Sequence, residues 1–419
     1  MHFLNAEYSI GEESNSQTDR LVRILIHDRP GYAFPAQLSR QLASRGYTVL
    51  HSYGAFFQGP KGELTKRSND PPLLEFEGLN LKKPFQKYRF SKRLFQELEY
   101  SQLLLRQIHT FRPDIVFFAD TPSEAQALIY WQGRHLGIPF VYWLQDVYGI
   151  ALEKLLRKRL KFVGQLVGAF YKALDRYLLR RSQHVILITE DFQPFLQEWG
   201  ISSQKSCVIP NWSPLDSFPV RPKNNNWAIE NNLADKFCLL YSGTLGMKHN
   251  PQLLLELALQ LSQYPQVRVV VVSEGLGADW LREQKAASGI DNLILFDYQP
   301  FDMVPDVLGT ADILVAILEP DAGIFSVPSK VLTYFCSARP LLLAVPPENL
   351  AARMVLRQKA GFVVPPAQTD KFVEQAKHLI ADDALREEMG RNGRIYAECH
   401  FDIEKIADQF EAIIQKLVK

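Results

Sequence analysis

The sequence predicts an α/β protein made of two doubly wound parallel sheets, and three observations predict it. Short apolar runs alternate with helical segments along most of the chain, which is the pattern of parallel sheets buried on both faces. Residues 211–234, rich in Asn, Pro and Ser, interrupt this alternation. The length of 419 residues also exceeds what one hydrophobic core usually organises.

The first half opens with the elements of a βαβ unit. The apolar run Leu21–His27 predicts a buried strand, Ala36–Ser44 a helix and Tyr47–Ser52 a second strand. Helices are also expected at Ser123–Leu136 and Asp191–Trp199. The remaining strands of this half are expected at Asp114–Ala119, Pro139–Leu144, His184–Thr189 and Ser206–Ile209.

The alternation resumes after residue 234. Strands are expected at Phe237–Tyr241, Val267–Val272, Leu293–Phe296, Ile313–Ile317 and Leu341–Ala344, with helices between them and a mostly helical stretch from Thr369 to Lys419. We therefore divide the chain into a flexible tail 1–20, a first domain 21–210, a linker 211–234, a second domain 235–400 and a final helix 401–419.

Charge and cysteine content exclude several kinds of partner. The formal net charge is +1, so we expect no nucleic-acid binding. The four cysteines lack CxxC spacing, which predicts no zinc site and favours a reducing compartment. Residues 1–20 do not resemble a signal peptide, and no apolar run reaches the ~20 residues needed to cross a bilayer. We expect a cytoplasmic protein.

The loop after the strand Phe237–Tyr241 is a candidate anion site. Gly243 and Gly246 permit a tight turn, and Lys248 stands close to the start of the next helix. Glycine-rich turns with a surface lysine are common, so an ordinary strand–helix turn is the alternative interpretation.

A second candidate follows the strand Ile313–Ile317. Gly323 can present backbone amides, and Ser329 and Lys330 place a hydroxyl and a cation in the first turn of a helix. A cation there opposes the helix dipole unless an anion also binds. The alternative is a helix cap whose lysine is solvated.

Two loops of the first half are expected to contact an acceptor. His27, Gly31 and Tyr32 follow the first strand, and Asp146 and Tyr148 follow the strand Pro139–Leu144. An acid at the end of a parallel strand is suited to a ligand cleft, so Asp146 is the candidate for handling an acceptor proton. A helix-capping aspartate is the alternative.

Five stretches stand out together by their order and spacing. They are Val208–Trp212 (VIPNW), Leu240–Asn250 (LYSGTLGMKHN), Phe296–Val315 (FDYQPFDMVPDVLGTADILV), Val327–Pro340 (VPSKVLTYFCSARP) and Gly390–Phe401 (GRNGRIYAECHF). With these stretches the chain resembles the retaining glycosyltransferases of family 4, in the variant with a Pro-Ser-Lys helix start. The resemblance implies the GT-B fold, in which two Rossmann-like domains face each other across a cleft and the last helix crosses back to the first domain.

The resemblance also implies roles for individual residues. The first domain would bind the acceptor and the second a nucleoside diphosphate sugar, with UDP- or GDP-sugars expected. Lys248 and Lys330, with backbone N–H groups near Gly243 and Gly323, would stabilise the departing diphosphate, and Asp146 would orient the acceptor hydroxyl. The donor-binding positions would be Gly243, Thr244, Lys248, Gln299, Pro300, Gly323, Ser329, Lys330 and Thr333.

The implied reaction moves a hexose-type sugar to a hydroxyl of a lipid-linked or polysaccharide precursor, with retention of configuration and without a metal or other cofactor.

The sequence departs from the family at three places. Thr244 stands where many members have arginine, Phe325 and Thr333 where many have glutamates, and Gln145-Asp146 where many have histidine. A nucleotide-sugar 2-epimerase of the same architecture and a non-catalytic nucleotide-sugar-binding subunit are the alternatives.

The segment 152–181 predicts a basic amphipathic helix. It carries many more Lys and Arg residues than acids, interleaved with Leu, Val, Phe and Tyr at helical spacing. Such a helix can lie on an anionic bilayer, and we expect peripheral contact with the inner face of the plasma membrane. The alternative is a surface helix whose apolar stripe packs on the sheet.

Overall fold

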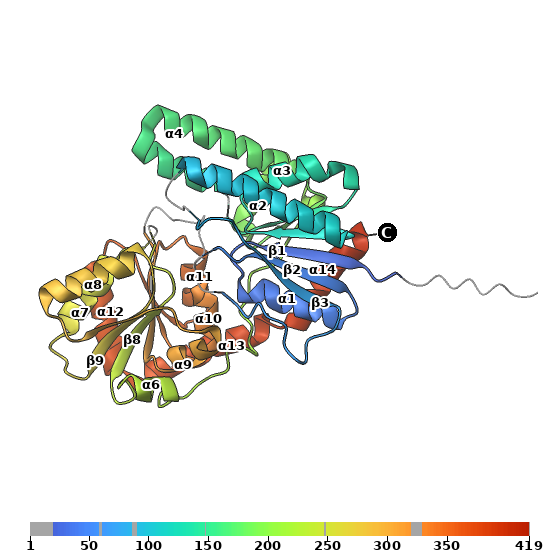
Figure 1. Ribbon diagram of the computed structural model, residues 1–419. Coiled ribbons are helices and arrows are strands. Elements are labelled where there is room, and N and C mark those ends of the chain that lie inside the picture. Colours follow the sequence, from blue (N-terminus) through green and yellow to red (C-terminus); the bar gives the residue numbers. More distant parts are fainter. Residues whose placement is uncertain are drawn as a thin grey trace, which may run out of the picture.

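The computed structural model describes residues 20–57, 61–85, 90–146, 148–246, 249–319 and 329–418, with the backbone alone for 90, 91, 94, 148 and 150–163. Two parallel sheets, each covered by helices on both faces, confirm the predicted α/β class (Figure 1). The predicted tail 1–20 lies outside the described residues except for Arg20.

The first sheet has the strand order β3-β2-β1-β4-β5-β6-β7 within the described chain. Helices α2 (Phe90–Phe111), α3 (Ser123–Gly133) and α4 (Tyr148–Arg181) cover one face, and α1 (Ala33–Ser44) and α14 (Ile403–Leu417) cover the other (Figure 1). The strands are β1 Arg23–Asp28, β2 Thr48–Gly54, β3 Leu74–Leu79, β4 Ile115–Ala119, β5 Phe140–Leu144, β6 His184–Leu187 and β7 Ser206–Val208, with α5 (Gln193–Glu198) between the last two.

The second sheet has the order β10-β9-β8-β11-β12-β13. Alternate strand residues join two different apolar clusters, one beneath α7, α8 and α12 and the other beneath α9, α10 and α11. The strands are β8 Phe237–Ser242, β9 Val267–Val272, β10 Leu293–Phe296, β11 Ile313–Ile317, β12 Leu341–Ala344 and β13 Gly361–Val364. The helices are α7 Pro251–Leu261, α8 Leu276–Ser288, α9 Val304–Gly309, α10 Lys330–Cys336, α11 Leu350–Arg357, α12 Thr369–Ala381 and α13 Asp383–His400.

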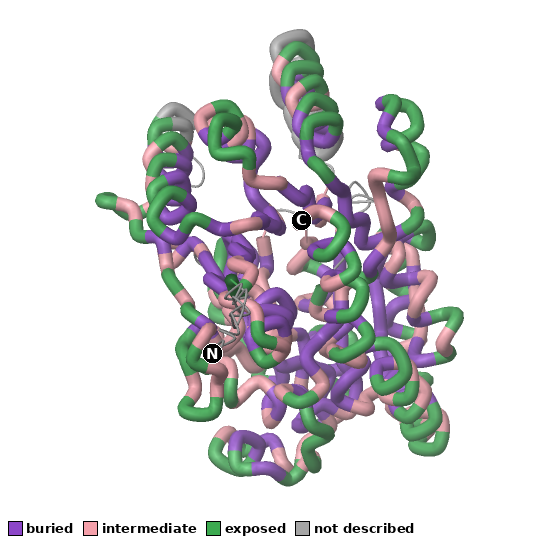
Figure 2. The backbone as a smooth tube through the Cα atoms, turned by 90° about the vertical axis from the view of Figure 1, so that its right-hand side faces the viewer, coloured by how far each residue is buried: buried purple, intermediate pink, exposed green. Residues whose placement is uncertain are grey.

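Figure 2 shows how burial follows this layering, with buried residues inside the molecule and exposed residues on the outer faces of the helices. Besides a short helix in the predicted linker, three elements were not predicted. β3 is an edge strand in which buried and exposed residues mix, β13 has four residues, and α11 is a short helix capped by Asn349. β3 lacks the continuous apolar run by which the other strands of this sheet are recognised.

The predicted linker 211–234 is more ordered than its composition suggests. It contains α6 (Asn226–Glu230), which begins where the Asn225 side chain accepts a hydrogen bond from Ala228 N. Trp212 and Trp227 are each 2% exposed. The segment therefore packs into the protein as part of its core.

The predicted helix 152–181 is part of α4, which does not run straight. Gly149 N donates a hydrogen bond to Asp175 Oδ2 at 2.7 Å. In a straight helix these two residues would lie about 39 Å apart. The two ends of α4 therefore lie side by side, and Gly149 is required there because a Cβ would stand 2.7 Å from Lys172 N.

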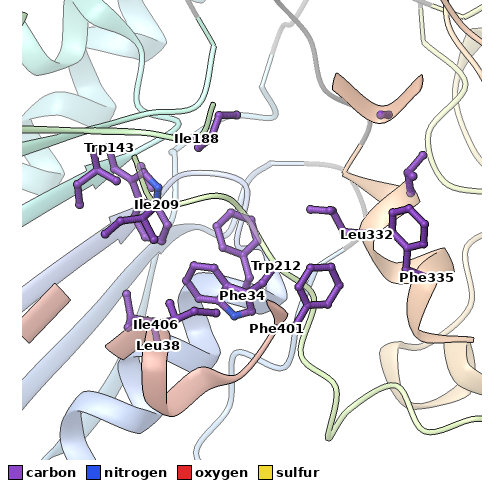
Figure 3. Packing of buried hydrophobic residues seen from close by; sticks show 14 of the residues in the cluster. Phe34, Leu38, Trp143, Ile188, Ile209, Trp212, Leu332, Phe335, Phe401 and Ile406 are labelled. Atoms are coloured by element: carbon purple, nitrogen blue, oxygen red, sulfur yellow. The ribbon is translucent and has the colours of Figure 1, made fainter. Parts of the chain in front are cut away.

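An aromatic cluster joins the linker and the last helix to the first sheet. The Trp212 ring lies 5.2 Å from Phe34 and 5.9 Å from Trp143, and Trp143 lies 4.8 Å from Phe410 of α14, as centroid distances. Trp212 Nε1 donates to Gln37 Oε1 at 2.8 Å, so its polar atom is satisfied. Figure 3 shows that the same apolar cluster continues through Phe401 to Leu332 and Phe335 of α10.

Charged contacts also hold α14 on α1. Arg45, at the end of α1, forms ion pairs with Glu404, Asp408 and Glu411 at 2.7, 2.7 and 2.8 Å. Tyr47 donates to Glu411 at 2.7 Å. The C-terminal helix thereby belongs structurally to the first domain although it follows the second in sequence.

Candidate functional site

The strand orders place the candidate site at the carboxyl edges of both sheets. In each sheet the order reverses between two neighbouring strands, β1 and β4 in the first and β8 and β11 in the second. Ligands of open α/β sheets bind at such reversals. The two edges face each other, because Arg353 of α11 forms a bidentate ion pair with Asp191 after β6, with one N–O distance of 3.0 Å.

Asp28 and Gly31 build the first loop of the first domain. Asp28 is fully buried; its Oδ2 accepts from Tyr32 N, and its Oδ1 has no partner among the described residues. Burial, followed by the nearby Asp120, raises the Asp28 pKa well above its usual value. Gly31 has φ +76° and lies against Leu64, so the turn requires glycine.

Acidic side chains gather around the Tyr32 hydroxyl. Burial raises the Tyr32 pKa, and Asp120, Asp28 and Asp146 raise it further, in that order. Asp28 is the last residue of β1, and Asp120 and Asp146 follow β4 and β5; the three strands are neighbours in the sheet. Asp120 also has a left-handed φ of 44°, an unusual conformation for a residue other than glycine. The predicted Asp146 thus belongs to a group of three acids.

Sequence reasoning did not select Asp28 or Asp120 as site residues. The signal was present, because each acid ends an apolar strand in the way that Asp146 follows β5. What the sequence does not reveal is the strand order, which brings the ends of β1, β4 and β5 together.

Asp175 ties two of these loops together. Its carboxylate is 2% exposed and accepts hydrogen bonds from Ser123, after β4, and from Gly149 N, after β5. Burial raises the Asp175 pKa to about 6. Gln145 is held by the side chain of Asn211. Its Oε1 accepts from Asn211 Nδ2 at 2.6 Å, and its Nε2 donates to Asn211 Oδ1 at 3.3 Å. The backbone around Asp146 is therefore fixed on both sides.

The structure corrects the expectation for His27. Its side chain is fully buried, Nδ1 contacts Ser52 Oγ at 2.9 Å and Nε2 contacts the Tyr100 hydroxyl. Burial lowers the His27 pKa well below its usual value. His27, near the end of β1, points into the core. It therefore supports the acceptor loops and does not reach a ligand.

In the second domain, most amides of the glycine loop already have acceptors. Gly243 N donates to Val272 O at 3.0 Å, Leu245 N to Ser273 Oγ at 3.1 Å, and Gly246 N to His249 Nδ1 at 3.1 Å. Within the described part of Ser242–Gly246, Thr244 N alone has none. The backbone donor expected near Gly243 is therefore the N–H of Thr244.

Lys330 is a buried cation beside this loop. Its Nζ is buried, has no hydrogen-bond partner among the described residues and lies 3.6 Å from the Tyr241 ring centroid. A Cβ on Gly243, which has φ +126°, would stand 3.0 Å from Nζ, so glycine leaves room for the lysine. Burial lowers the Lys330 pKa well below its usual value. A single ring face is weak compensation for a desolvated ammonium group.

The other predicted donor positions have these surroundings. Ser329 precedes α10 and is exposed, and Thr333 accepts a hydrogen bond from Ser213 of the linker at 3.2 Å. Gln299 Oε1 accepts from Trp227 Nε1 at 3.0 Å, and Pro300 follows it at the surface. Lys248, Gly323, Phe325 and the Tyr148 side chain lie outside the described residues.

Comparison with known families gives two matches that together span most of the chain. The model of "Glycosyltransferase Family 4" matches residues 36–216, and the model of "Glycosyl transferases group 1" matches residues 223–396. WcaI of Escherichia coli, named for glycosyl transfer in colanic acid biosynthesis, is 27% identical over 172 residues. That alignment covers 40% of this chain and 41% of WcaI.

Solved structures share the fold at low sequence identity. Sucrose-phosphate synthase of Thermosynechococcus elongatus has a TM-score of 0.71 at 16% identity, over 94% of this chain and 99% of that one. Anabaena HepE in complex with UDP-glucose has a TM-score of 0.67 at 16% identity, over 94% and 99% of the two chains. The likeness therefore covers both domains and their connection.

The surroundings of Lys330 give a prediction for stability. Replacing Lys330 with Met should raise the free energy of unfolding by about 1–3 kcal/mol, because a buried amine that lacks partners is exchanged for an apolar chain of similar length. Urea denaturation of both proteins at pH 7.5 measures the difference. A loss of stability in Lys330→Met would show that the lysine is a structural residue and would contradict this description.

Proposed function

This chain belongs to the family 4 glycosyltransferases of the GT-B fold, and we propose that it transfers a hexose-type sugar from a nucleoside diphosphate sugar to a hydroxyl acceptor. The observation that carries the proposal is the buried Lys330 amine, which has no anionic partner among the described residues. A diphosphate would supply the missing negative charge.

The second domain brings two described donor groups for a diphosphate together. Lys330 Nζ lies against Gly243, and the adjoining Thr244 N–H has no acceptor in the described structure. Lys248 of the same loop is expected to add a second cation. These groups would stabilise charge that grows on the diphosphate as the bond to the anomeric carbon breaks, so the scheme needs no metal.

The first domain offers acceptors for a sugar hydroxyl. The carboxylate of Asp146 would orient the attacking hydroxyl and take its proton as the new glycosidic bond forms. Burial raises the Asp28 pKa well above its usual value and so favours the protonated carboxyl, which can donate a hydrogen bond where Asp146 accepts one. Retention of configuration and a lipid-linked or polysaccharide precursor as acceptor are part of the proposal, supported by the resemblance and by the named role of WcaI.

A donor panel tests this function. Purified protein is mixed with UDP-, GDP- and ADP-sugars, and both the melting temperature and the release of free nucleotide are followed. One donor should raise the melting temperature and release its nucleotide, with both effects lost in Lys248→Ala and in Lys330→Met because the diphosphate loses its cations. The matched control is Lys371→Ala, an exposed lysine on α12.

The panel also separates the proposal from its alternatives. Release that depends on an added glycan or lipid acceptor supports transfer, whereas a donor isomerised without any acceptor indicates an epimerase. Binding without turnover across all acceptors indicates a nucleotide-sugar-binding subunit. If no donor binds, the diphosphate site is wrong and the proposed function is refuted.

The outer face of α4 supports peripheral contact with an anionic membrane. Leu166, Phe170 and Tyr177 are 58%, 61% and 44% exposed, and their spacing places them on one side of the helix. Basic residues flank them, and the Arg181 guanidinium lies 5.7 Å from the Tyr177 ring centroid. None of the described helices is long and apolar enough to cross a bilayer. Apolar side chains among cations favour anionic lipid headgroups.

Vesicle sedimentation tests this contact. The protein should pellet with vesicles containing phosphatidylglycerol and not with neutral phosphatidylcholine vesicles, and Phe170→Ser should reduce binding at least threefold because an inserted ring is lost. Ile395→Ser, which changes a residue 57% exposed on α13, is the matched control. Equal binding by the two variants would refute α4 as the membrane face.

A further inference from the structure

Two hydroxyl groups form a pair at the edge of the glycine loop. Thr244 Oγ1 and the Tyr298 hydroxyl lie 2.6 Å apart and join the loops that follow β8 and β10. Both loops are fixed, because the Tyr241 hydroxyl donates to Thr244 O at 2.8 Å and Tyr298 N donates to Glu274 Oε1 at 3.3 Å. The pair is thus a preformed feature of the second domain.

The pair has one hydroxyl hydrogen that is not used in the bond between the two groups. Each hydroxyl carries one hydrogen, and the bond between them uses one of the two. Neither hydroxyl has another hydrogen-bond partner in the described parts of the chain. The phenol is the more acidic of the two groups and therefore the stronger hydrogen-bond donor. An anion would accept a hydrogen bond from the Tyr298 hydroxyl, while the Thr244 hydroxyl donates to the phenol oxygen.

The pair lies where the two halves of the site meet. Thr244 also carries the loop N–H without an acceptor and follows Gly243, which contacts Lys330. On the other side, Tyr298 interacts with Tyr32 of the first domain, as the last of the groups that raise the Tyr32 pKa after burial and the three acids.

We infer that Tyr298 is a further donor-binding residue, whose hydroxyl donates a hydrogen bond to a diphosphate oxygen while Thr244 positions it. This inference rests on the proposed function and adds a residue that the sequence did not indicate. The pair takes the place of the arginine that many family members carry after the first glycine. It replaces a cation by a directed neutral donor, which gives a weaker but more geometrically selective contact.

The test compares ligands with and without phosphates. Calorimetry gives the dissociation constants of UDP, GDP and ADP for the wild-type protein. The nucleoside with the same base as the tightest-binding diphosphate is then measured by competition, which gives its dissociation constant. The same values are measured for Tyr298→Phe, Thr244→Val and the double variant. Tyr264→Phe, at the turn before β9, is the matched control for loss of a phenol.

Tyr298→Phe should weaken the diphosphate about tenfold and leave the nucleoside within twofold, because a hydrogen bond to a charged group is lost. Thr244→Val should weaken the diphosphate about two- to threefold, and the double variant should be no weaker than Tyr298→Phe. Melting temperatures report folding. Equal weakening of diphosphate and nucleoside, or no change in either, overturns the inference while the proposed function stands. A wild-type protein that binds none of the three diphosphates refutes both.

Discussion

The packing of Trp212 against the first domain is the contact on which the arrangement of the site depends. The linker enters the core here, between Phe34 of α1 and Trp143 of β5, and α14 adds Phe410 to the same cluster. Large aromatic surfaces buried together are among the strongest contributions to a core. Because the linker and the last helix are both anchored, the second sheet is held with its carboxyl edge toward that of the first.

This arrangement divides the chemistry between two surfaces of opposite character. The first domain contributes acids around Tyr32, whereas the second contributes Lys330 and the Thr244 amide. In the described structure Lys330 Nζ and the Thr244 N–H have no acceptor, so a ligand that carries both an anion and hydroxyl groups complements the two surfaces. The folded protein gives up stability to keep Lys330 buried, as binding sites commonly do.

The sequence predicted most strands because their apolar runs are buried on both faces, and it placed Lys330 and Asp146 at the sheet edges for the same reason. It failed where a contact depends on strand order or on distant segments. His27 was expected to contact an acceptor, although β1 is buried to its last residue. Tyr298 shows no signal, because its partner Thr244 lies 54 positions away. The return of α4 on itself depends on Asp175, which a helical pattern alone does not reveal.

The central claim is that a diphosphate is the missing partner of Lys330. Burial lowers the Lys330 pKa well below its usual value, so the charged form of the amine is disfavoured until an anion lies beside it. An adjacent diphosphate raises that pKa again, so its binding should be coupled to proton uptake. Calorimetric titration with the donor sugar nucleotide at several pH values between 7 and 10, in HEPES and in Tris buffer, measures this uptake from the buffer dependence of the enthalpy. We predict net proton uptake on donor binding within this pH range. Tight binding whose enthalpy is the same in both buffers would contradict the account.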